Sequence, residues 1–137
     1  MDSGADASRH DYRALLMSSD IDIKGLRYHH LGVPILEPHA GEEHVPHLGI
    51  HMVPWNTNPF GIELMRFDES CTVPDLVRKV PHLAFEVPDL DLALVGREVL
   101  IAPNAPSGGV RVAFIAHAGL PVELMEFSDP RDPRRAR

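Results

Sequence analysis

The sequence has few of the features of secreted, membrane-spanning or nucleic-acid-binding proteins. Its single cysteine, Cys71, excludes a disulfide within the chain, and no group of residues has the spacing of a zinc finger. No run reaches the ~18 apolar residues of a membrane span, so we expect no membrane partner. Basic residues gather only at 131–137 in a chain with a net charge of −7, which argues against a nucleic-acid partner. Because the N-terminus lacks an apolar signal core, we expect a cytoplasmic protein.

The composition is that of a folded domain. Of the 137 residues, 44% are hydrophobic and 24% are charged, which supplies enough apolar material for one compact core. Residues 1–25 have few apolar anchors and are expected to form a loose arm, with at most one turn of helix at 11–17. We expect a single domain at 26–128 and a solvated tail at 129–137.

Proline and glycine divide the domain into short segments, most of which have the pattern of strands. Residues 88–96 begin with Pro and Asp and end with Gly, which predicts a short helix. Residues 35–46 are predicted to be a loop, 68–80 a connector and 103–109 a turn. The ranges predicted to be strands are 26–35, 47–53, 60–67, 81–87, 97–102, 110–118 and 120–127.

Two of these strands repeat each other, and each contains an acid. GIELMRF at 61–67 is matched by PVELMEF at 121–127. Because alternate side chains of a strand share a face, Glu63 and Glu123 each lie on a face that is otherwise mostly apolar. A buried carboxylate without a partner is costly and tends to take up a proton. Each acid therefore needs a compensating positive charge.

The strands that open the two halves carry histidines in matching places, His30 and His82. Such a repeat usually marks two copies of one unit about a shared axis, so we predict two modules, 26–67 and 81–127. The axis would bring the two histidines and the two glutamates to one place. Two imidazoles and two carboxylates suit one divalent ion such as Ni, Co, Zn, Mn or Fe. The predicted metal ligands are His30, Glu63, His82 and Glu123.

With these residues the chain resembles the vicinal oxygen chelate superfamily, which includes glyoxalase I, methylmalonyl-CoA epimerase, extradiol dioxygenases and the fosfomycin and bleomycin resistance proteins. The resemblance covers residues 26–128 and is clearest in PHLAFEVPDLDLAL (81–94) and GVRVAFIAHAGLPVELMEF (109–127). It implies an α+β fold of paired βαβββ modules, in which a mixed sheet curls into a cup around the metal. The loop at 35–46 suggests that the first module has lost its helix. The set of two histidines and two glutamates is most similar to that of glyoxalase I.

The leading functional prediction is a metal-dependent isomerase, epimerase or lyase that acts on a small hydroxy-carbonyl or dicarbonyl substrate. The metal would stabilise the enolate that forms when a carbon acid loses its proton. Glyoxalase-like enzymes use a ligand glutamate to move that proton, so Glu63 and Glu123 are both candidate catalytic bases. One alternative is an extradiol-type dioxygenase, which would hold iron with two histidines and one carboxylate. Another is a binding or resistance protein that uses the same cup without catalysis.

Further histidines compete for roles at the site. His29 should point to the opposite face from His30 and be structural or exposed. His47 and His51 are four residues apart in a predicted strand, so they share a face and are predicted to bind substrate if that face lines the cup. His47 is also a lower-ranked alternative to His30 as a metal ligand. The remaining histidines are expected in loops or at the rim: His39, His44 and His117.

The small size of the two modules predicts self-association. Each has about 40 to 50 residues, which is near the lower limit for an independent core. The sheet edges of a trimmed first module need cover, and glyoxalase-like chains of this size commonly pair, sometimes with sites shared between subunits. We therefore expect a homodimer.

Overall fold

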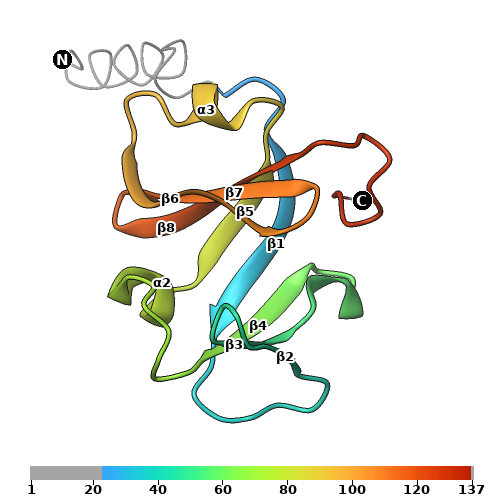
Figure 1. Cartoon of the computed structure of the whole chain (residues 1–137), viewed down its shortest axis with the longest axis vertical. Coiled ribbons are helices and arrows are strands. Elements are labelled where there is room, and N and C mark those ends of the chain that lie inside the picture. Colours follow the sequence, from blue (N-terminus) through green and yellow to red (C-terminus); the bar gives the residue numbers. More distant parts are fainter. Residues whose placement is uncertain (1–22, 137) are drawn as a thin grey trace, which may run out of the picture.

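The computed structural model describes residues 23–136. The helical turn predicted at 11–17, and most of the predicted arm, lie outside these residues. In the described part of the chain, eight strands form one mixed sheet that carries only short helices (Figure 1). No helix among residues 23–136 is long and apolar enough to span a bilayer.

The elements follow each other in two similar halves. The first half contains β1 (Arg27–Pro34), β2 (Glu43–Val45), β3 (Ile50–Val53), the 3-10 helix η1 (Trp55–Thr57) and β4 (Ile62–Phe67). The helix α2 (Asp75–Lys79) connects the halves. The second half contains β5 (His82–Glu86), α3 (Leu90–Ala93), β6 (Glu98–Ser107), β7 (Val110–His117) and β8 (Leu120–Phe127).

The order of strands across the sheet confirms the predicted repeat and the α+β fold. That order is β2-β3-β4-β1-β5-β8-β7-β6. In each half the first strand runs parallel to the fourth, β1 beside β4 and β5 beside β8, and the other neighbours are antiparallel. The two halves join through the antiparallel pair of β1 and β5. Residues 35–42 contain no helix, whereas α3 lies at the matching point of the second half, so the predicted loss of the first helix is confirmed.

The main core lies on the outer face of the second half, beneath α3 at the top of Figure 1. Asp89 caps this helix, because its side chain accepts a hydrogen bond from the Leu92 N–H at 3.1 Å. Strand alternation places Leu124 in this core and the neighbouring Glu123 on the opposite, inner face, as predicted. The buried core residues are Val87, Leu90, Ala93, Ala113, Ile115 and Leu124.

Several predicted boundaries are wrong. The predicted strand at 47–53 begins only at Ile50, and the predicted loop at 35–46 contains the short strand β2. The predicted connector contains α2. Strand β6 continues to Ser107. It includes Pro103 and Pro106, although these residues predict a turn. Because β6 is the outermost strand of the sheet, the nitrogen of a proline there, which has no hydrogen to donate, can face away from β7. No hydrogen bond between the two strands is then lost.

The expectation of a solvated tail is also wrong for the described residues 129–136. The Arg135 Nε donates to one oxygen of Glu86 at 2.7 Å, and the backbone N–H of Ala136 donates to the other. The Arg134 guanidinium donates to Ser107 Oγ at 2.8 Å and to the Gly108 carbonyl at 2.7 Å. These contacts bring the C-terminal segment back beside β1 (Figure 1).

Candidate metal site and pocket

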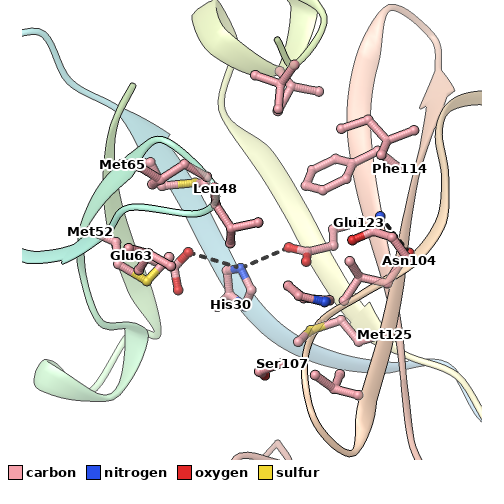
Figure 2. A pocket seen from close by; sticks show the side chains of 18 of the residues that line it. His30, Leu48, Met52, Glu63, Met65, Asn104, Ser107, Phe114, Glu123 and Met125 are labelled. Atoms are coloured by element: carbon pink, nitrogen blue, oxygen red, sulfur yellow. Dashed lines mark hydrogen bonds and ion pairs between the residues drawn. The ribbon is translucent and has the colours of Figure 1, made fainter. Parts of the chain in front are cut away.

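A cavity of about 410 Å³ lies between the inner faces of the two halves (Figure 2). Its wall is mostly apolar and includes three methionines, Met52, Met65 and Met125, and three phenylalanines, Phe67, Phe114 and Phe127. The polar residues at its wall are His29, His30, His47, Glu63, Asn104, Ser107, Glu123 and Arg134. This mixture of an apolar wall and a few converging polar groups is typical of a small-molecule site.

Three of the four predicted metal ligands line this cavity, His30 on β1, Glu63 on β4 and Glu123 on β8, and the fourth, His82 on β5, contacts Glu123 from behind the wall. The Nε2 of His30 is 3.3 Å from Oε1 of Glu123 and 3.9 Å from Oε1 of Glu63. The Nε2 of His82 is 3.2 Å from the same oxygen of Glu123. Figure 2 shows His30 between the two carboxylates. The twofold relation of the modules therefore places these side chains together, although metal binding by them stays a prediction.

The spacing of these atoms fits a divalent ion. Ligand atoms that are each about 2.1 Å from one ion lie about 3 to 4 Å from one another. His30, His82 and Glu123 meet this requirement most closely, with ligand atoms all within 4.8 Å of one another. Glu63 lies slightly farther out, 3.9 Å from the Nε2 of His30, and its predicted role as a fourth ligand stays a prediction.

The hydrogen bonds of His29 determine which nitrogen of His30 faces the site. The Nε2 of His29 is 2.5 Å from the Arg134 carbonyl, which can only accept, so this nitrogen carries a hydrogen. Burial lowers the pKa of His29 and keeps the ring neutral, which leaves a lone pair on its Nδ1. That Nδ1 is 2.7 Å from the Nδ1 of His30, so the His30 Nδ1–H must be the donor. In a neutral His30, the Nε2 lone pair then points at the two carboxylates.

A lone pair facing carboxylate oxygens is unfavourable unless a proton or a metal ion lies between them. The Nε2 of His30 is buried without a hydrogen-bond partner in the described structure, and so is the Nδ1 of His82. Buried polar atoms of this kind usually indicate an ion or water that completes the site. The arrangement of His30, His82 and Glu123 therefore fits a metal ion, which would satisfy the unpartnered His30 nitrogen.

The two glutamates have opposite electrostatic environments. Burial raises the pKa of Glu63, and the nearby Glu123 adds to the rise, while His30 only partly opposes it. Burial would also raise the pKa of Glu123, but its contacts with His30 and His82 prevail and lower it to about 2. Burial depresses the pKa of His30, yet its contact with Glu123 raises it overall. Glu123 is thus the acid that stays charged at neutral pH.

Gly32 makes room for His82. The two residues are opposite each other on β1 and β5. A Cβ atom at position 32 would lie 2.1 Å from the Cε1 of His82, which is shorter than any tolerable contact. A glycine is therefore required for the ring to reach the site. This role of Gly32 leaves no signal in the sequence, because nothing in HHLGVP indicates which residue lies opposite the glycine.

The predicted orientation of His29 is wrong, because a β-bulge lies between Tyr28 and His30. The bulge inserts one extra residue into β1, so His29 and His30 both face the cavity. The bulge left no signal in the sequence except the pair of adjacent histidines.

The prediction that His47 and His51 share one face is also wrong. His47 lies in a turn before β3 and lines the cavity, where its Nε2 is 3.1 Å from the Pro106 carbonyl. A role for it in substrate binding stays a prediction. His51 lies on β3 between Ile50 and Met52, which line the cavity, and it bonds Asp68 on the opposite face. It is therefore not placed to bind substrate in this cavity.

Solved structures of other proteins share this architecture. A hypothetical protein from Bacillus halodurans superposes with a TM-score of 0.56 at 15% sequence identity, over 80% of this chain and 99% of that chain. The methylmalonyl-CoA epimerase from Mycobacterium tuberculosis superposes with a TM-score of 0.52 at 23% identity, over 78% of this chain and 90% of that chain. These similarities establish the glyoxalase-like α+β cup as the fold. Neither a family model nor a curated protein matches the sequence.

We predict that the desalted protein holds about one divalent ion per chain in this cavity. His82→Ala should lose most of it, because one of the three closest ligands is removed. Elemental analysis of both proteins after gel filtration checks the result. His39→Ala is the matched control, since His39 is exposed and its ring bonds the neighbouring Ala40 carbonyl, away from the cavity. Full metal content in the His82 variant would show that the ligand set is wrong.

A second prediction concerns His29. His29→Phe keeps an aromatic ring next to Trp55, whose centroid is 4.4 Å away, but removes the acceptor for the His30 Nδ1–H. Loss of such an orienting partner typically weakens metal binding by about 10 to 100-fold. Competition with a chelator measures the affinity, and ¹⁵N NMR of the imidazoles reports the His30 tautomer. An unchanged tautomer together with unchanged affinity would contradict this role.

Proposed function

We propose that this protein is a metal-dependent isomerase or epimerase, or a lyase, acting on a small oxygenated substrate. The observation that carries the proposal is the group of His30, His82 and Glu123 beside a second buried carboxylate, Glu63, in an apolar cavity. A divalent ion bound there would supply Lewis-acid stabilisation of charge on a substrate oxygen. The fold shared with methylmalonyl-CoA epimerase supports proton transfer next to a carbonyl group as the reaction type.

We assign different roles to the two glutamates. Glu123 contacts both imidazoles through a single oxygen, so its carboxylate is part of the ligand group. Glu63 lies farther from the group and faces the cavity from the opposite half. It is therefore the side chain that can move a proton on the substrate. His47 and Asn104 are at the same wall and would orient substrate oxygens.

The cavity favours a small and largely uncharged substrate. Among the described residues no lysine lines it, and the guanidinium of its arginine, Arg134, is held by Asp132, Ser107 and the Gly108 carbonyl. Few cationic donors are therefore directed at a phosphate or carboxylate group. A volume of about 410 Å³ suits a compact hydroxy-carbonyl or dicarbonyl compound with an apolar body.

One observation favours a second candidate, the extradiol-type dioxygenase. The structure groups two histidines and one carboxylate most tightly, and this is the ligand set of many non-haem iron oxygenases. Glu63 distinguishes the two functions, because a carboxylate 3.9 Å from the Nε2 of His30 would crowd the positions that catechol and oxygen need. Metal analysis separates them: Ni, Co, Zn or Mn in the purified protein favours the isomerase, and Fe favours the dioxygenase.

The test of the leading proposal is proton exchange in D₂O. A panel of α-hydroxy-carbonyl and 2-keto compounds is incubated with metal-replete protein, and deuterium at the α-carbon is followed by NMR. Glu63→Gln should keep its metal and lose exchange by roughly 10²–10⁴-fold, because an amide cannot accept the proton. Glu123→Gln should lose metal as well.

His117→Gln serves as the control, since this exposed residue at the end of β7 is not at the cavity wall. If wild-type protein exchanges no compound of the panel, the proposed reaction is refuted and the binding-protein alternative leads. If exchange persists in Glu63→Gln, another side chain is the base.

We also propose that the chain forms a homodimer through the outer face of its first half. Helix α3 packs against β7 and β8 and α2 packs against β8, whereas only the short 3-10 helix η1 contacts β1 and β4, so among the described residues α3 has no α-helical counterpart over these two strands. On this face Leu31 is opposite Leu83, which is 39% exposed. Val33, Ile62 and Leu64 extend the apolar strip. A sheet face of this kind needs cover, and a second copy of the same face would supply it.

Light scattering across micromolar concentrations should therefore give the mass of a dimer. Leu83→Glu should shift the protein toward monomer, because a charge would be buried in the interface. Leu92→Glu, on α3 over the second half, where Leu92 is 70% exposed, should leave the dimer intact. A monomer in the unmodified protein would overturn the proposal.

A further inference from the structure

A second group of metal-ligating side chains lies on the outer face of the first half, outside the cavity. It consists of His44 on β2, His51 on β3 and Asp68 directly after β4. His44 and His51 are cross-strand partners, and their rings stack with centroids 4.0 Å apart and an interplanar angle of 6°. Their Nε2 atoms are 3.3 Å and 2.9 Å from the two oxygens of Asp68.

The strands hold these three residues in place. The Asp68 N–H donates to the Gly49 carbonyl at 2.8 Å. The Asp68 carbonyl accepts from the Arg78 guanidinium at 3.0 Å and from the Cys71 N–H at 3.0 Å. Because the backbone on both sides is hydrogen bonded and the two histidines are on paired strands, the group is largely preorganised.

The guanidinium groups beside this group bond other atoms than the Asp68 carboxylate. Arg66 forms a bidentate pair with Glu42, with distances of 3.0 and 2.9 Å, and Arg78 donates to the backbone carbonyls of Asp68 and Cys71. Burial would raise the pKa of Asp68, but hydrogen bonds from His51 and His44 lower it overall, so the carboxylate is charged. A divalent cation would be accepted there without displacing another ion pair.

We propose that His44, His51 and Asp68 form a second divalent-cation site, separate from the pocket and independent of the proposed function. Two imidazoles and a carboxylate favour a borderline ion such as Zn²⁺, Cu²⁺ or Ni²⁺. In the stacked arrangement both Nε2–H groups donate to Asp68, so metal binding through Nε2 requires each neutral ring to carry its hydrogen on Nδ1 instead. His44 is 47% exposed on a three-residue edge strand, and its ring can turn so that the two lone pairs converge.

An ion bound at this site would stabilise one wall of the cavity. It links the edge strand β2 and the strand β3 to the end of β4 (Figure 1). The other face of the same strands supplies Val45, Ile50 and Met52 to the cavity wall. A bound ion would therefore hold the hairpin of residues 43–53 in the shape that the cavity requires. Because its ligands are partly exposed, this ion exchanges with solvent and is removed by desalting, unlike an ion in the buried site.

The experiment is Zn²⁺ titration by calorimetry of the full-length His82→Ala protein, in which the pocket site is disabled. We expect about one saturable ion per chain in this background. Adding His51→Ala should weaken binding at least tenfold, since loss of a ligand costs no less than loss of its orienting partner. Adding His39→Ala, which alters a histidine outside the group, should change nothing.

Asp68→Asn provides a second variant that keeps the shape of the side chain, and it should also lose the ion. Imidazole signals in ¹H–¹⁵N spectra should shift on adding Zn²⁺ for His44 and His51 alone. Equal binding by the His82→Ala protein with and without His51→Ala would overturn the proposal, as would weak binding that never saturates. Neither result bears on the pocket, because the pocket ion is tested by elemental analysis of the desalted protein that keeps His82.

Discussion

The antiparallel pairing of β1 with β5 is the interaction on which the rest of the structure depends. It joins two halves that each have the same strand order, and it places Gly32 opposite His82. The absence of a side chain at Gly32 lets the His82 ring lie over β1 and reach the carboxylate of Glu123. A bulge in the same pair turns His29 toward the cavity beside His30. One pair of strands thus connects the modules and assembles most of the site.

The second constraint is the burial of acids in an apolar cup. Taking a carboxylate out of water costs several kcal/mol unless opposite charge and hydrogen bonds replace the water. Glu123 obtains both from His30 and His82, whereas Glu63 has only a distant imidazole. The pKa values of the two acids consequently move in opposite directions, which is how sites separate a ligand role from a proton-transfer role.

The C-terminal segment contributes to the same site from outside the repeat. Its Arg134 carbonyl accepts from His29, which in turn orients His30. Its Arg135 neutralises Glu86, a buried acid on the strand that carries His82. A basic end that has the composition of a solvated tail is therefore part of the structure around the cavity. Composition describes which groups prefer water, but a specific buried partner can outweigh that preference.

Much of this molecule follows from short-range patterns in the sequence. The alternation in GIELMRF and PVELMEF places Glu63 and Glu123 on inner faces, and the repeat implies the twofold arrangement that brings His30 and His82 to them. These inferences succeed because side-chain direction in a strand depends only on position along it.

Other features were decided only by the tertiary structure. A bulge reverses the side-chain alternation at His29, and a turn removes His47 from the strand of His51, so that the two histidines lie on different faces. The role of Gly32 and the docking of the C-terminal segment likewise depend on which residue lies opposite in another strand. Such pairings join residues 49 or more positions apart, and they are selected by packing and hydrogen bonding across the whole sheet, which local pattern does not encode.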